Sequence, residues 1–198
     1  MGKTIATSVV VGLMWLSYVA WPLYDLNVLV KAFEMRDVEI LRRHIYFESA
    51  RRSLADQIVA TYMRRSGVQL GPLAQGVAAS ALAIADPIVA KVMSPEALCE
   101  FLTTGWPVTV VPDVPAGTVG ISTSSLRNVW QVFAASEYGL GRFSVSLPQS
   151  LSPPQRFALA FRLLQWRWQL TSITLPEKIQ DLLADELIKS MKAPARTQ

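Results

Sequence analysis

The sequence has very few of the side chains on which metal and thiol chemistry depend. Cys99 is its single cysteine and His44 its single histidine. One cysteine excludes an intramolecular disulfide framework, and one histidine excludes zinc sites built on paired histidines or on a Cys/His cluster. Residues 139–141 contain two glycines outside any dinucleotide-binding motif. Residues 120–124 lack the last glycine of the G-x-S-x-G motif that carries the nucleophile of many hydrolases. We expect no metal, no cofactor and no catalytic residue, with Cys99 a buried structural thiol and His44 a surface residue near a helix end.

Charge is also scarce. Charged residues make up 17% of the 198 residues and apolar residues 51%, and the formal net charge is +4. Soluble globular proteins usually carry about 25% charged residues. The length fits one domain with an appendage. The shortage of charge therefore predicts that part of the chain contacts lipid.

The apolar excess is concentrated in residues 4–24, where no charged side chain occurs before Asp25. About 20 helical residues match a hydrocarbon core of roughly 30 Å. Aromatic rings crowd the second half of this segment, as they do at membrane interfaces, and Pro22 marks a place for the helix to end or bend. We predict an uncleaved signal anchor. A cleaved signal peptide and a buried core helix are the alternatives, and residues 18–22 are too bulky to favour cleavage.

The membrane orientation follows from the flanking cations. Lys3 favours a cytoplasmic N-terminus, and Lys31 and Arg36 on the other side weaken that preference. We predict a single pass through the inner (cytoplasmic) membrane, with the domain on the periplasmic side. A second apolar stretch, residues 70–93, includes Asp86 and Pro87. A charged group is costly at a bilayer centre, so we predict a soluble helix interrupted at that pair.

The spacing of apolar residues predicts helices followed by strands. We expect a hairpin of two short helices up to Ile45, a helix from about Glu48 to Ser66-Gly67, and one from Ser94-Pro95 to Thr104-Gly105. The strand candidates are residues 129–135, 142–147, 156–162 and 167–175, and residues 177–191 form an amphipathic helix. Its apolar stripe docks on its own sheet or on a partner helix. This order predicts an α+β fold with an antiparallel sheet, divided into an anchor (1–24), a domain (25–176) and a terminal helix and tail (177–198).

Several landmarks fall in an order that resembles a known family. They are Pro22, Leu26, Leu29, residues 45–54, residues 94–98, Arg142-Phe143, and residues 168–173 with Leu175-Pro176. Over most of residues 20–176 the chain resembles the bacterial membrane-anchored family called domain of unknown function 2939. The family usually has an acidic residue where this chain has Tyr46, so a pairing of that carboxylate with Arg51 is in doubt. The resemblance implies an N-terminal anchor and no assigned activity.

A second resemblance concerns the fold alone. Helices followed by a curved antiparallel sheet are similar to the nuclear-transport-factor-2-like cone, which often holds a ligand in its open mouth. Fold analogy does not define a function. We interpret Arg51, Trp130, Phe143 and Trp168 as structural or ligand contacts.

The arginines of residues 36–65 lie on predicted helices. The spacings Glu48–Arg52 and Arg52–Asp56 allow internal pairing, so we interpret most of this charge as a solvated helix face. Attraction to anionic lipid headgroups is the alternative. Aromatic residues do not alternate with these cations, which argues against nucleic acid as a partner.

Three functions remain open. The first is a non-catalytic binding module of the bacterial cell envelope, which binds another envelope protein or lipid, shows an exposed apolar patch and has no convergent polar cluster. The second is a binding cone for a small apolar ligand, with a cavity behind the tryptophans. The third is a hydrolase-type enzyme in which Asp86, Asp113 and Glu137 converge beside His44. We favour the first and expect no enzyme.

Overall fold

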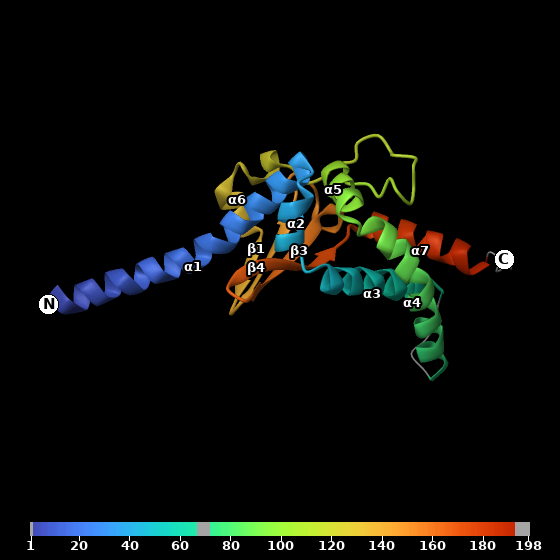
Figure 1. Cartoon of the computed structure of the whole chain (residues 1–198), viewed down its shortest axis with the longest axis horizontal. Coiled ribbons are helices and arrows are strands. Elements are labelled where there is room, and N and C mark those ends of the chain that lie inside the picture. The colour runs from blue at the N-terminus through green and yellow to red at the C-terminus, as the bar shows by residue number, and fades with distance from the viewer. Residues whose placement is uncertain (1, 67–71, 193–198) are drawn as a thin grey trace.

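The structure is a computed structural model that describes residues 2–66 and 72–192 (Figure 1). Its α-helices are α1 (Gly2–Met35), α2 (Val38–His44), α3 (Phe47–Ser66), α4 (Pro72–Val92), α5 (Pro95–Thr104), α6 (Val129–Ala134) and α7 (Glu177–Lys192). Two short 3-10 helices, Thr123–Leu126 and Pro153–Gln155, lie in the loops.

Four strands follow the helical half of the chain. They are β1 (Ser136–Gly139), β2 (Arg142–Leu147), β3 (Phe157–Leu164) and β4 (Arg167–Thr174). Each pairs antiparallel with its neighbour in the order β1-β2-β3-β4. The predicted α+β class is confirmed, with a helical N-terminal half, an antiparallel sheet and a C-terminal helix.

The prediction of a strand at residues 129–135 is wrong. Residues 129–134 form the helix α6, because the Asn128 side chain accepts a hydrogen bond from the Gln131 backbone N–H and caps its first turn. The hairpin instead joins β1 to β2 through Leu140-Gly141, where Gly141 has φ +66°. The predicted pair of strands after residue 156 is confirmed as β3 and β4.

Helix α1 has two parts with different surroundings. Side chains from Ser8 to Ser17 are all exposed, whereas Leu26, Leu29 and Phe33 are buried against the domain. The helix runs through Pro22 without ending there. Ser8–Met35 is long and apolar enough to cross a membrane, and an 18-residue window within it has a mean hydropathy of 1.4. One continuous helix therefore carries both the predicted anchor and the first helix of the domain.

The other helices begin and end largely where the sequence predicts. Asp37 caps α2 by accepting from the N–H groups of Glu39 and Ile40, and Ser94 caps α5 by accepting from Ala97. Helix α4 contains Pro87 and is continuous, so the predicted interruption at Asp86-Pro87 is wrong. The proposed glycine cap of α3, Gly67, lies outside the described residues.

Helices α3, α4 and α7 pack together at the end of the molecule opposite to the projecting half of α1 (Figure 1). The buried stripe of α7 includes Ile179, Leu183 and Leu187. Arg65 of α3 donates to the Asp181 carbonyl and pairs with Asp185 at 3.0 Å. The stripe of α7 thus packs mainly on α3 and α4 and not on the sheet, which was one of its two predicted surfaces.

The sheet has one aromatic face and one open face. Phe143, Phe161 and Trp168 point into the core and are each about 1% exposed. Their rings make edge or tilted contacts, with centroids 5.7 Å apart for Phe143–Phe161 and 6.5 Å for Phe143–Trp168. Alternate residues, such as Arg142 and Ser144, point to the other side, and α3 packs against β4 at the edge of the sheet.

Candidate functional site

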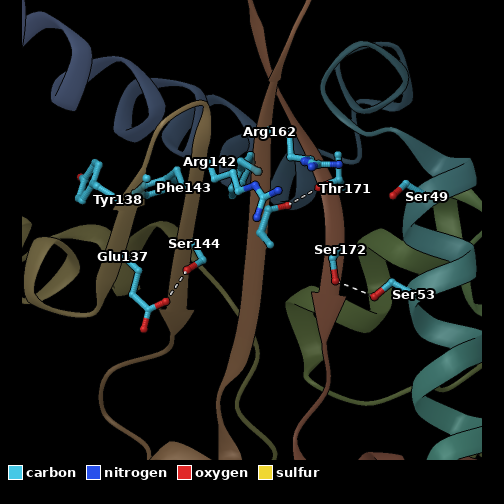
Figure 2. A pocket seen from close by; sticks show the side chains of 13 residues that line it. Ser49, Ser53, Glu137, Tyr138, Arg142, Phe143, Ser144, Arg162, Thr171 and Ser172 are labelled. Carbon is cyan, nitrogen blue, oxygen red and sulfur yellow. Dashed lines mark hydrogen bonds between the residues drawn. The ribbon is translucent and has the colours of Figure 1, made fainter.

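A groove of about 550 Å³ lies on the open face of the sheet, between the strands and α3 (Figure 2). Its floor is made of small residues that leave space above the strands: Gly139, Ser144, Ala160 and Ser172. Ser49 and Ser53 of α3 form one wall. This size is typical of small-ligand sites.

Two arginines face each other in this groove. Arg142 of β2 and Arg162 of β3 are direct cross-strand partners and are both exposed. Directly opposed residues have Cβ atoms about 5 Å apart, and like charges in that position destabilise a sheet. Within residues 8–66 and 81–190, whose side chains the structure describes, neither guanidinium forms an ion pair or a side-chain hydrogen bond. The groove therefore holds two adjacent cations whose donors are available.

Hydroxyl groups also line the groove. Ser53 and Ser172 share a hydrogen bond of 2.6 Å across the gap between α3 and β4, and the Thr171 hydroxyl donates to the Ala160 carbonyl at 3.3 Å. Glu137 is the one carboxylate among the lining residues, and it accepts a hydrogen bond from Ser144 at 3.5 Å. Two arginines and one glutamate leave the lining with a net positive charge. The groove is thus polar and basic.

The hairpin ends of the sheet lie beside α1, where that helix leaves the domain (Figure 1). Tyr18 of α1 donates to the Gly139 carbonyl at 3.0 Å and accepts from the Gly141 N–H at 2.8 Å. Its ring also contacts Trp168, with centroids 6.1 Å apart. The projecting half of α1 is therefore fixed to the β1–β2 turn.

Four exposed apolar side chains lie on α6 and on the two hairpin turns of the sheet, and we call them the collar. They are Trp130 and Phe133 on α6, Leu140 in the β1–β2 turn and Trp166 in the β3–β4 turn. Leu140 is 99% exposed, Trp130 82% and Trp166 80%. Phe133 and Leu140 share a pocket with Trp15, Tyr18 and Val19 of α1.

The β3–β4 turn presents Trp166 at a conformational cost. Leu164 pairs with Arg167, so the loop is only Gln165-Trp166, and both residues have positive φ, +49° and +61°. This geometry is that of a type I′ turn, which favours Asn-Gly. A large aromatic residue held exposed in such a strained position is typical of a functional surface.

The four residues interpreted as structural or ligand contacts lie in different surroundings. Arg51 is half-exposed and pairs with Asp86 of α4 at 3.1 Å, and Tyr46, the departure from the family pattern, is exposed. Trp130 belongs to the collar. Phe143 and Trp168 are core residues on the aromatic face, although Phe143 also borders the groove from below. No tryptophan lines the groove, so this groove is not the apolar cavity that was expected behind the tryptophans.

The carboxylates expected for an enzyme have separate partners. Asp86 pairs with Arg51, Glu137 lies in the groove, and Asp113 is exposed in the loop after α5. His44 is half-buried and faces Asp25, with Nε2 and Oδ1 3.9 Å apart, rather than any of these three groups. Within the described part of the chain, no cluster of three or more His, Cys, Asp or Glu side chains suits a metal.

Cys99 is fully buried on α5, and burial raises the pKa of its thiol above the usual value. Burial likewise raises the pKa of Tyr138. The cations of residues 36–65 are largely paired. Arg52 pairs with Glu48 at 3.7 Å, as predicted, and Arg43 with Glu39 at 2.8 Å, while among the described ion pairs none joins Arg52 to Asp56.

Arg142 and Arg162 are the site residues that sequence reasoning missed. A signal was present, because Arg142, Ser144 and Ser146 alternate with apolar residues, and so do Ala158, Ala160 and Arg162. Each strand therefore predicts a polar or small outer face. Only the register of β2 on β3 brings the two arginines opposite each other.

The fold and the groove define an α+β domain with an apolar N-terminal helix and a basic, hydroxyl-lined cleft. Residues 11–101 match the family described as "Protein of unknown function (DUF2939)". The resemblance to that family is thus confirmed over residues 11–101, whereas the landmarks on the sheet lie outside the matched segment. No curated protein and no solved structure matches the chain, so the likeness to a nuclear-transport-factor-2-like cone stays a prediction.

Proposed function

We propose that this chain is a single-pass membrane-anchored binding module whose domain is seated directly on the bilayer surface. The observation that carries the proposal is the fixed junction between α1 and the hairpin ends through Tyr18. Because this junction sets the level of the collar along α1, the exposed apolar side chains meet the membrane when α1 spans it. We place the domain on the periplasmic side of a bacterial inner membrane.

The dimensions support this seating. The helix from Gly2 to Tyr18 is about 24 Å long, at about 1.5 Å per residue. A hydrocarbon core is roughly 30 Å thick. Because residues 2–18 are shorter than this core, α1 can cross it only if the level of Tyr18 lies at or below the edge of the hydrocarbon, which brings Leu140 and Trp166 into contact with lipid. Tryptophan favours that region because its ring is amphipathic.

The proposal keeps the favoured interpretation of the sequence and changes one of its details. That interpretation requires an exposed apolar patch, which the collar provides. It also expects no convergent polar cluster, and the groove is such a cluster. The groove is lined by arginines, hydroxyls and one glutamate, so it favours a polar anionic ligand over the small apolar ligand of the alternative function. We propose binding rather than catalysis as its role.

Two measurements on the full chain test this proposal. Reporter fusions after Gln198 fix the topology: a periplasm-specific reporter is expected to be active, and activity of a cytoplasmic reporter alone would place the domain on the other side. For the seating, Leu140→Cys labelled with an environment-sensitive fluorophore in vesicles is expected to be quenched by brominated lipids.

Ser150→Cys is the matched control, since Ser150 is exposed in the β2–β3 loop at the opposite end of the sheet. Its label is expected to stay in water and escape quenching. Equal quenching at the two positions, or at neither, would show that the collar does not contact the bilayer.

A further inference from the structure

We propose that the groove is a binding site for a phosphate-type anion, held between the guanidinium groups of Arg142 and Arg162. This inference goes beyond seating on a membrane, because it assigns a ligand chemistry to a separate surface of the domain. The argument rests on the pairing of the two arginines, on the donors around them and on the space above the strands.

The first step concerns charge. Opposed arginines repel each other, and in most sheets an acidic residue faces a basic one. Two other arginines of the chain have acceptors within the protein: Arg51 pairs with Asp86, and Arg156 donates to two backbone carbonyls. Arg142 and Arg162 have no such acceptor among the described residues. An anion between them would convert the repulsion into attraction.

The second step concerns geometry. Guanidinium groups present several N–H donors in one plane and bind phosphate or carboxylate oxygens through paired hydrogen bonds. Figure 2 shows the Arg142 and Arg162 side chains close together at the same end of the groove. The Ser49 hydroxyl lies on the wall of the groove, and Ser144 and Ser172 lie farther along its floor. These hydroxyl groups add donors for the outer oxygens or for the group that carries the phosphate.

Glu137 is the nearest candidate for an ion pair with the two arginines, but its carboxylate has another partner. It sits two residues from Gly139, the cross-strand partner of Arg142, yet its carboxylate is bound to Ser144 instead. The same carboxylate would repel a bound anion. Removing its charge is therefore expected to strengthen anion binding, whereas removing either arginine weakens it.

The source of the phosphate is either a lipid headgroup or a soluble molecule. Arg142 directly follows the β1–β2 turn, and Arg162 lies close to the β3–β4 turn, so both arginines stand at the collar end of the sheet. If the domain is seated as proposed, headgroup phosphates are within reach. A soluble phosphate compound reaches the same groove from its open side.

Inorganic phosphate is the probe for the shared chemistry. The full chain in neutral detergent is titrated with phosphate at constant ionic strength, balanced with chloride, and the dissociation constant is taken from the rise of the thermal midpoint. Arg142→Gln and Arg162→Gln are each expected to weaken binding at least about tenfold, and Glu137→Gln to strengthen it about threefold. Arg64→Gln, an exposed arginine at the far end of α3, is the matched control and is expected to bind like the unaltered protein.

Phosphate stabilisation that is absent, or that falls equally in Arg64→Gln and Arg142→Gln, would overturn the site. A normal far-ultraviolet spectrum in each variant excludes misfolding as the cause. This experiment uses detergent, so it succeeds or fails independently of the seating on a bilayer.

A second arm identifies the source. The same titration is made in nanodiscs of phosphatidylcholine alone and in nanodiscs that contain phosphatidylglycerol. A lower apparent affinity for phosphate in the nanodiscs with phosphatidylglycerol, seen alike in the unaltered protein and in Arg64→Gln, assigns the site to a lipid headgroup. Phosphate binding that is equal in both lipids supports the site with a soluble ligand.

Discussion

The two faces of the four-stranded sheet are built from the same strands and have opposite compositions. On one face Phe143, Phe161 and Trp168 are nearly fully buried and contact one another. On the other face Arg142 and Arg162 stand opposed above a floor of small residues. Because side chains alternate along a strand, the aromatic face supplies the folding energy, and the open face is free to carry groups that folding does not need.

This difference separates residues that hold the fold from residues that give the domain a binding surface. Trp168 and Trp166 lie two residues apart and show the contrast clearly. Trp168 is 1% exposed in the core, and Trp166 is 80% exposed in a strained turn beside α1. The fold needs the first ring, whereas the second ring lies on the surface and adds little to the core.

The largest effect is expected on the aromatic face. Phe161→Ala removes a ring that is 1% exposed and leaves a cavity beside Phe143. We expect the free energy of unfolding to fall by about 4 kcal/mol. Urea unfolding of the full chain in detergent, followed by circular dichroism, measures this loss.

The neighbouring residue on the open face is the control. Ala160→Ser adds one hydroxyl to the floor of the groove. It is expected to change the free energy of unfolding by less than about 0.5 kcal/mol. Equal losses for Phe161→Ala and Ala160→Ser would mean that the two faces do not differ as described.

An effect of intermediate size is expected on thiol reactivity, which compares the buried core with the open groove. Cys99 is buried and the pKa of its thiol is raised by burial, so at pH 8 it is protonated and inaccessible. In Ser144→Cys a second thiol lies in the open groove, where the reagent can reach it. We expect the new thiol to react with an aromatic disulfide reagent about a thousand times faster than Cys99.

The unaltered protein, which has Cys99 alone, gives the rate of the buried thiol. Ser144→Cys in a Cys99→Ala background gives the rate of the thiol in the groove. Rapid reaction of the unaltered protein would show that Cys99 is accessible, contrary to its burial. Slow reaction of Ser144→Cys in the Cys99→Ala background would show that the groove is closed.

Most of the helical half follows from the sequence because its signals are local. Ser94-Pro95 begins α5, and Asp37 begins α2, through side-chain caps that depend only on neighbouring residues. The misread segment had a local signal as well. The apolar residues 129–134 favour a strand, but Asn128 before them is a favoured capping residue, and its side chain caps the first turn of a helix.

The candidate site was much harder to predict because it depends on contacts between distant residues. Each arginine is visible on the outer face of its own strand, but the pairing of Arg142 with Arg162 depends on the strand register. The turn at Gln165-Trp166 also lacks the asparagine and glycine that usually mark such hairpins, so the sequence does not indicate that the Trp166 ring is exposed.

The smallest expected effect is on the open face itself. Arg162→Gln removes one of two opposed positive charges, so in phosphate-free buffer at low salt the free energy of unfolding is expected to rise by about 0.5 kcal/mol. High salt screens the repulsion, so this gain is expected to vanish near 1 M sodium chloride. Adding Arg142→Gln to the first change removes no further repulsion between the pair and gives no further gain. Urea unfolding in detergent at both salt concentrations measures these differences. A loss of stability in Arg162→Gln at low salt would mean that the guanidinium already has a partner, and that the two faces of the sheet are less distinct than their composition indicates.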